Sequence, residues 1–108
     1  MEVKKDLGKG VKDDGKKPLP SLIFGGFPYG ISQLVDVGTM GARKYARDGW
    51  QTVPNWEERY VDAMSRHFLA SFKECRDPES GIDHLAHLAW NCLALMELRK
   101  ERDDDKGK

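Results

Sequence analysis

Residues 77–91 read DPESGIDHLAHLAWN, and this stretch carries the clearest structural signals in the chain. Asp77 can cap free amides, Pro78 suits the first helical position, and Glu79 places negative charge where the helix dipole favours it. The apolar residues that follow should stabilise a helix by packing, in spite of a glycine in its first turn. The sequence therefore predicts a helix from about Pro78 to about Glu101.

This predicted helix carries a polar seam in otherwise apolar surroundings. His84 and His87 are three positions apart, and Asp83 lies four positions before His87, so their side chains project close together. Asn91 follows one turn later and extends the seam.

Two further helices are predicted upstream, from about Ser32 to Tyr45 and from Trp56 to about Lys73. The first rests on an approximately helical spacing of apolar residues, and the second begins after Asn55, a good capping residue. The buried face of the second helix is expected to be Trp56, Tyr60, Ala63, Met64, His67, Phe68 and Ala70. No segment alternates convincingly as a strand, so we expect an all-α fold, a small bundle of three main helices.

The remaining segments divide the chain into one domain and two tails. Residues 1–17 are rich in lysine, aspartate and glycine and predict a flexible charged tail. Residues 18–101 are expected to form a single helical domain, which opens with an extended apolar segment, 18–30, laid across its body. Its docking residues would be Leu22, Ile23, Phe24 and Phe27. Residues 102–108 predict a charged C-terminal tail.

Composition limits the function classes. A chain of 108 residues forms a small core and is expected to need help from a partner subunit. The formal net charge is zero, which argues against direct binding of a nucleic-acid polymer or of an anionic membrane. No apolar run approaches a membrane span and no signal peptide is evident, so we expect a cytoplasmic protein.

All three histidines should converge. Short connections make neighbouring helices antiparallel, which places His67 at a similar height to His84 and His87. The side chains expected nearby are Asp83, Glu79, Asp62 and Arg66. Imidazole with carboxylate suits a divalent metal such as Mn²⁺, Co²⁺ or Zn²⁺, or Mg²⁺-assisted phosphate chemistry. The alternative, a structural polar network in the core, is equally open at this point.

A second cluster combines cations with aromatic rings: Arg43, Lys44, Tyr45, Arg47 and Trp50. Such a set can bind phosphates and stack on a base. The alternative is a solvated helix end, with Tyr45 and Trp50 buried in the core. Lys16 belongs to a segment, 13–17, that could fold over an anionic ligand or remain a solvated tail.

Three blocks of the sequence resemble a known family. MGARKYARDGW (40–50), RYVDAMSRH (59–67) and DPESGIDHLAH (77–87) are similar to the phage-type dATP/dGTP diphosphohydrolase N-terminal domain family. That family is similar to the MazG-like, all-α nucleoside triphosphate pyrophosphatases. The resemblance implies a dimer or tetramer that hydrolyses a deoxynucleoside triphosphate to monophosphate and pyrophosphate, with metal ions held between two helices.

The chain departs from the MazG-like pattern at the metal site. Those enzymes use ExxE on one helix and ExxD on the next, but HLAH (84–87) lies where the second motif is expected, and the first has no clear counterpart. Two acids replaced by imidazoles favour a softer metal or none.

The sequence thus predicts a phage-encoded, metal-dependent pyrophosphohydrolase for dATP and dGTP. His67, His84 and His87 would hold the metal with the catalytic acids Glu79 or Asp83. Arg43, Lys44 and Arg66, with Lys16, would bind phosphates, and Tyr45 or Trp50 would contact the base. The alternatives are a non-catalytic nucleotide-binding protein, such as a sponge for a cyclic or phosphorylated nucleotide or a regulatory subunit, and a purely helical interaction module.

Overall fold

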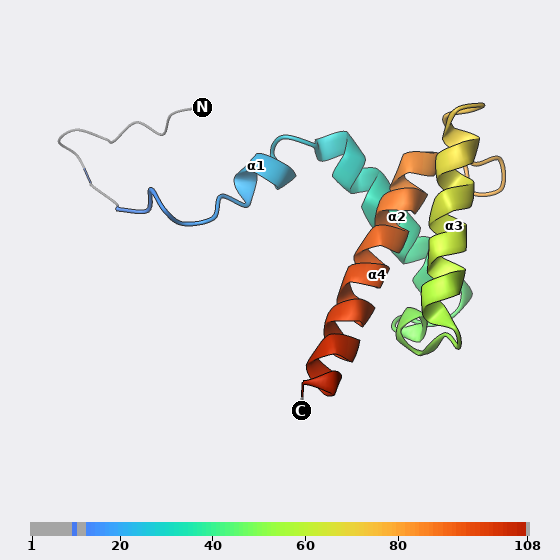
Figure 1. Ribbon diagram of the computed structural model, residues 1–108. Helices are drawn as coiled ribbons and strands as arrows, with labels where there is room; N and C mark the ends of the chain where they lie inside the picture. The colour runs from blue at the N-terminus through green and yellow to red at the C-terminus, as the bar shows by residue number, and fades with distance from the viewer. Residues whose placement is uncertain (1–9, 11–12, 108) are drawn as a thin grey trace.

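A computed structural model of the chain describes residues 10 and 13–107. The elements in chain order are α1 (Ser21–Phe24), α2 (Pro28–Lys44), the 3₁₀ helix η1 (Gly49–Thr52), α3 (Trp56–Ser71) and α4 (His84–Lys106), as Figure 1 shows. Within the described residues, the only β pairing is an isolated bridge between Arg76 and Asp83. The prediction of a small all-α bundle is confirmed.

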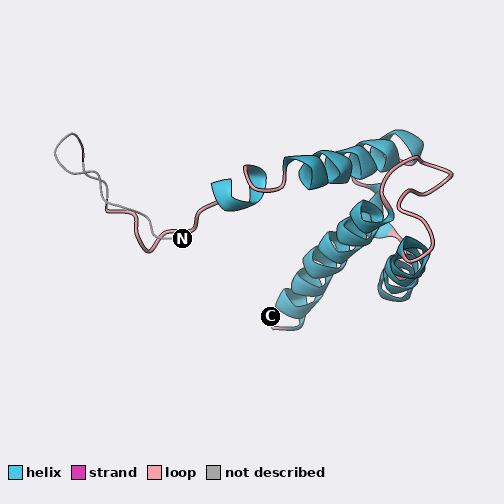
Figure 2. Cartoon of the chain, turned by 90° about the horizontal axis from the view of Figure 1, so that it is seen from above, coloured by secondary structure: helices cyan, strands magenta, loops and turns pink. Residues whose placement is uncertain are grey.

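The antiparallel pair α3 and α4 forms the frame of the molecule, and α2 crosses it on one side (Figures 1 and 2). One core cluster consists of Tyr60 of α3 with Ala94, Leu95 and Leu98 of α4. A second cluster joins α2 to the start of α4 and contains Val37, Ile82 and Ala86. Trp90 packs against both clusters.

The helix α4 begins at His84, later than the predicted Pro78. Asp83 is its N-cap, and the Asp83 carboxylate accepts a hydrogen bond from the Leu85 amide at 2.8 Å. Asp77 and Asp83 could each cap a helix here, and the conformation of Gly81 explains why the helix begins after Asp83. Its φ of 74° places it in the left-handed region, which interrupts any helix that begins at Pro78. Residues 77–83 therefore form a loop that leads into α4.

The far end of α4 also differs from the prediction. The helix continues to Lys106 rather than ending near Glu101, so most of the predicted C-terminal tail is helical. Lys100 and Asp104, one turn apart, form an ion pair at 2.6 Å within this extension. Lys108 lies outside the described residues.

At the N-terminal side, α2 begins at Pro28 instead of Ser32, with proline in the first turn. The predicted extended segment contains the short helix α1. The large apolar side chains of this segment are exposed, including Leu22 (48%), Phe24 (66%) and Phe27 (60%). The prediction that they dock on the body of the same chain is therefore wrong. Most of the predicted tail, residues 1–9, 11 and 12, lies outside the described residues.

The helix α3 starts at the predicted Trp56, although Asn55 at the cap position has φ 56° and makes no side-chain cap bond. Glu57 in its first turn instead binds Arg99 at 2.7 Å and Arg102 at 3.2 Å on α4. None of the helices in the described part of the chain combines the length and apolar character that a membrane crossing requires.

Candidate functional site

The three histidines lie together between the end of α3 and the start of α4, as the sequence predicts. His67 Nδ1 lies 3.0 Å from His84 Nδ1. The rings of His67 and His87 are stacked, with centroids 4.4 Å apart and planes inclined by 9°. His84 and His87 are buried, and His67 is half-buried. We call this group the histidine cluster.

The outer nitrogens of the cluster are held by the loop that precedes α4. His84 Nε2 lies 3.2 Å from Glu74 Oε1, and His87 Nε2 lies 2.8 Å from Ser80 Oγ. The Ser80 hydroxyl donates to Asp77 Oδ2 at 3.1 Å and accepts from the Ile82 amide at 3.2 Å. Because the single hydroxyl proton is committed to Asp77, the hydrogen shared with His87 must come from His87 Nε2.

Burial sets the charge state of the cluster. Desolvation, with the neighbouring histidine charges, lowers the pKa of His67. Desolvation likewise lowers the pKa of His87, and this effect outweighs the attraction of Asp77, whose Oδ2 lies 3.6 Å from His87 Nε2. Burial opposes ionisation of Asp77, but bonds from the Glu79 amide and the Ser80 hydroxyl leave its pKa below the usual value. The lowered pKa values favour the neutral forms of His67 and His87, and two carboxylates, Asp77 and Glu74, lie beside the cluster.

The residues present do not fit a protein-held metal ion. Among residues 10 and 13–107, no group of three or more histidine, cysteine or acidic side chains is arranged to hold one. The imidazole nitrogens described above face each other or the loop acceptors instead of a common point. Asp83 caps α4, and Glu79 is exposed and lies 3.8 Å from Lys44 Nζ. The predicted ligand set therefore does not gather around one point within this chain.

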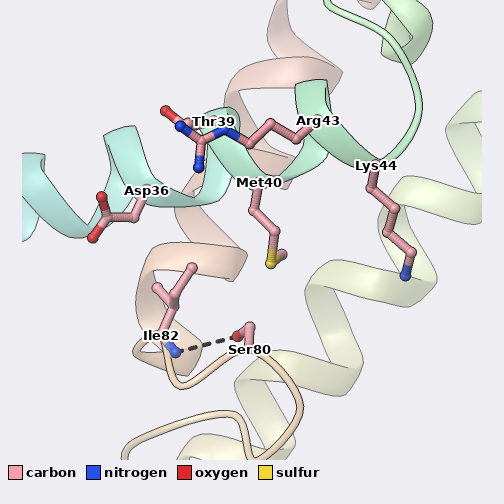
Figure 3. Close-up of a pocket in the computed structure, with 7 residues that line it drawn as sticks. All are labelled: Asp36, Thr39, Met40, Arg43, Lys44, Ser80 and Ile82. Atoms are coloured by element: carbon pink, nitrogen blue, oxygen red, sulfur yellow. Dashed lines mark hydrogen bonds between the residues drawn. The ribbon is translucent and has the colours of Figure 1, made fainter.

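A hollow of about 560 Å³ lies beside the cluster, between α2 and the loop (Figure 3). The last turns of α2 supply Arg43 and Lys44, and the loop supplies Ser80, the same residue that contacts His87. In Figure 3, Lys44 points toward the loop, while Arg43 extends back along α2. The other lining residues are Asp36, Thr39, Met40 and Ile82. The hollow thus combines two cations, two hydroxyls and a carboxylate with the apolar side chains of Met40 and Ile82.

The structure separates the two aromatic residues predicted to contact a base. Tyr45 is 76% exposed, and its ring centroid lies 5.3 Å from Lys44 Nζ. Trp50 packs edge-on against Trp90, with centroids 6.2 Å apart, and its carbonyl accepts from the Tyr60 hydroxyl at 2.7 Å. Trp50 therefore belongs to the core, as the alternative interpretation held, while Tyr45 remains available beside the hollow.

Other predicted residues lie apart from the hollow. Asp62 and Arg66 are exposed on α3, and only Arg66 is near the cluster, where its charge contributes to lowering the pKa of His67. Lys16 is exposed and belongs to the N-terminal segment that leads away from the helices in Figure 2. Arg47 is exposed in the loop after α2.

Sequence reasoning missed the residues that hold the histidines. Asp77 was interpreted only as a helix cap, and neither Ser80 nor Glu74 was considered. The available signal was the DPES sequence itself, because an aspartate with a serine three positions later readily closes a hydrogen-bonded turn. Here that turn supplies the acceptor for His87.

Comparison with protein families gives one finding. The family described as dATP/dGTP diphosphohydrolase, N-terminal, matches residues 8–106 of the chain. The comparisons with curated proteins and with solved structures gave no match. The family match covers α1 to α4, the histidine cluster and the hollow. The chain therefore belongs to the dATP/dGTP diphosphohydrolase N-terminal family.

Proposed function

We propose that this chain takes part in the hydrolysis of dATP and dGTP to monophosphate and pyrophosphate, and that it binds the triphosphate at the hollow. The observation that carries the proposal is the pair Arg43 and Lys44 beside Ser80, in a chain whose family name specifies this activity. The family describes an N-terminal domain, so the proposal assigns substrate binding to this chain and allows that further domains complete the reaction.

The chemistry of the hollow suits phosphate groups. Arginine presents a planar fork of donors that matches phosphate oxygens, and lysine adds a compact positive charge. Both side chains are exposed, so a ligand reaches them without any rearrangement of the core. Tyr45 lies next to Lys44 and could stack on a purine ring while the cations hold the phosphates.

Asp36 and Glu79 introduce negative charge at the same place and would repel a bare triphosphate. Triphosphates normally bind with a divalent cation that the phosphates themselves coordinate. We therefore propose that Mg²⁺, Mn²⁺, Co²⁺ or Zn²⁺ enters with the nucleotide, and we assign it no histidine ligands.

One observation favours a second candidate, a protein that binds the nucleotide without cleaving it. The histidines, which are the natural candidates for activating water, are engaged with each other and with the loop. A chain with this geometry could act as a nucleotide sponge or a regulatory subunit with the same phosphate contacts.

A titration and a product assay distinguish the two functions. Binding of dATP, dGTP, dCTP and dTTP is measured by calorimetry with each divalent ion, and pyrophosphate is then quantified in the same mixtures. Pyrophosphate from the purine nucleotides supports hydrolysis, whereas tight binding with the nucleotide recovered intact supports the second candidate.

The hollow is tested by the double variant Arg43→Ala, Lys44→Ala. Since a hydrogen bond to a charged group contributes about 1.5–3 kcal/mol, loss of the two cations should weaken purine nucleotide binding at least about tenfold. Arg59→Ala, at an exposed arginine on α3 outside the hollow, is the matched control and should bind as the parent does. Unchanged binding in the double variant would place the nucleotide elsewhere.

A further inference from the structure

One face of the α3–α4 pair is apolar and uncovered. On α4, Leu85, Leu93 and Met96 are 46–65% exposed and recur at spacings of eight and three, which places them on one stripe. At the end of α3, Phe68 and the C-cap residue Phe72 are one turn apart, 49% and 75% exposed, and their rings contact edge-on with centroids 5.2 Å apart. The prediction that Phe68 is buried is therefore wrong.

These two stripes lie on the same side of the pair. His67 of α3 touches His84 of α4, so these residues mark where the helices face each other. The next residue on each helix is rotated by about 100°, and in antiparallel helices the two rotations lead to the same side. Phe68 and Leu85 are therefore neighbours across the pair.

The sulfur contact between Cys92 and Met64 continues this side further along the helices. Ala86 packs toward α2 from another side of α4. We call the side made by Phe68, Phe72, Leu85, Leu93 and Met96 the outer face.

The same chain carries a second uncovered apolar surface, the segment 19–27, which we call the arm. Leu19, Leu22, Ile23, Phe24 and Phe27 are all exposed. Figures 1 and 2 both show the arm directed away from α3 and α4.

Within the arm, Gly25 and Gly26 make a tight turn after α1 that leaves no room for side chains. A Cβ would come within 2.8 Å of the Ser21 carbonyl oxygen at Gly25 and within 2.4 Å of the Leu22 carbonyl oxygen at Gly26.

The resemblance already implies a dimer or tetramer, and we propose how two copies meet: the arm of one copy packs on the outer face of another. An arm that leads away from its own body cannot cover its own outer face, whereas a second copy provides a match for both surfaces at once. Reciprocal exchange between two copies gives a closed dimer. The formal net charge of zero removes long-range repulsion between copies. This assembly does not depend on the proposed nucleotide function.

The dimensions agree with such a contact. Residues 85–96 of α4 extend about 17 Å, and packed helices lie about 8–10 Å apart, so the outer face is a shallow apolar surface of a few hundred Å². Contiguous apolar patches of about this size are among the largest on soluble monomers and are often functional. Two reciprocal contacts double the buried surface and bring it toward the size of a specific interface.

The proposal is tested with the full chain by light scattering after size-exclusion chromatography, at micromolar concentrations. The parent should have twice the monomer mass. Phe24→Asp in the arm and Met96→Asp on the outer face should each shift the mass to that of the monomer. Val35→Asp, at a 58% exposed apolar residue of α2 outside both surfaces, is the matched control and should leave the dimer intact. Far-UV circular dichroism checks that every variant retains its helices.

A mixing experiment separates arm exchange from other modes of association. Phe24→Asp copies retain an intact outer face, and Met96→Asp copies retain an intact arm, so an equimolar mixture should recover a dimer fraction that neither variant forms alone. A parent that is monomeric at 100-fold higher concentration would overturn the proposal. So would an oligomer that survives Phe24→Asp, or a mixture that stays monomeric.

Discussion

Acidification from pH 7.5 to 5.5 should destabilise the fold through the histidine cluster. Burial lowers the pKa of both His67 and His87, whereas the unfolded chain takes up these protons near pH 6.5. The unfolded state therefore binds more protons below that pH, and the free energy of unfolding falls as the pH falls. The stability is fully present above about pH 6.5 and is lost on acidification until the pKa values of the folded state are reached.

The magnitude follows from the number of histidines that folding keeps neutral. Each histidine changes the free energy of unfolding by at most about 1.4 kcal/mol per pH unit. Two histidines could therefore lower the free energy of unfolding by about 2–3 kcal/mol over one pH unit. The total free energy of unfolding of a small domain is about 5–15 kcal/mol, so a change of this size is measurable. The groups facing the cluster have opposing effects, because Asp77 and Glu79 attract the protonated forms and Arg66 repels them. The Asp77 pKa is itself lowered, so its own contribution is lost only below about pH 4.

The assay is urea denaturation followed by tryptophan fluorescence at pH 7.5, 6.5 and 5.5. The variant His87→Asn removes one titrating ring, and its free energy of unfolding should depend on pH about half as steeply as that of the parent. Equal stability of the parent at pH 7.5 and 5.5 would refute the reasoning. An undiminished slope in His87→Asn would show that the relevant protons bind elsewhere.

Three further perturbations test the fold. Leu95→Ala should lower the free energy of unfolding by about 2–5 kcal/mol in urea titrations, because Leu95 is only 4% exposed in the α3–α4 core; a loss below 1 kcal/mol would contradict its place there. Asp83→Ala should lower the free energy of unfolding by about 0.5–2 kcal/mol, because it removes the α4 cap. Asp83→Asn should retain both the stability and any nucleotide hydrolysis of the parent. Loss of hydrolysis in Asp83→Asn would instead indicate a catalytic role for Asp83. Gly81→Ala should lower the free energy of unfolding by about 1–2 kcal/mol through backbone strain alone, since a Cβ there meets nothing within 4 Å. Thermal melts measure this loss, and an unchanged melting temperature would argue against the left-handed turn.

The sequence predicted the helices well where one signal stood alone. The start of α3 lies at the predicted Trp56, although the capping bond on which the prediction rested is not formed by Asn55. The meeting of the three histidines followed from the antiparallel pairing of neighbouring helices. The start of α4 was misplaced because the predicted cap was Asp77, whereas Asp83, predicted only as part of the polar seam, is the N-cap. The choice between them depends on Gly81 and on the contact of the Asp83 amide with the Gln33 side chain, 50 positions away.

The candidate site was predictable in composition more than in arrangement. Arg43 and Lys44 were expected at a helix end and lie there. The roles of Trp50 and Ser80 depend on tertiary contacts, with Trp90 and with His87 respectively, that no local pattern encodes. The arm was expected to dock on its own domain because apolar segments usually bury their surface, but its large side chains are exposed in this chain.

Trp90 has a consequence for how the molecule unfolds. Its ring packs against both core clusters, and the rings of Tyr60 and Trp50 both contact it edge-on. Trp90 therefore links the two clusters, while Val37 and the Gln33–Asp83 hydrogen bond also hold α2 to the start of α4. We expect this link to make the two clusters unfold together. Without the indole, α2 could detach at lower denaturant concentration while the helical hairpin persists, and helicity and tertiary fluorescence would no longer be lost together.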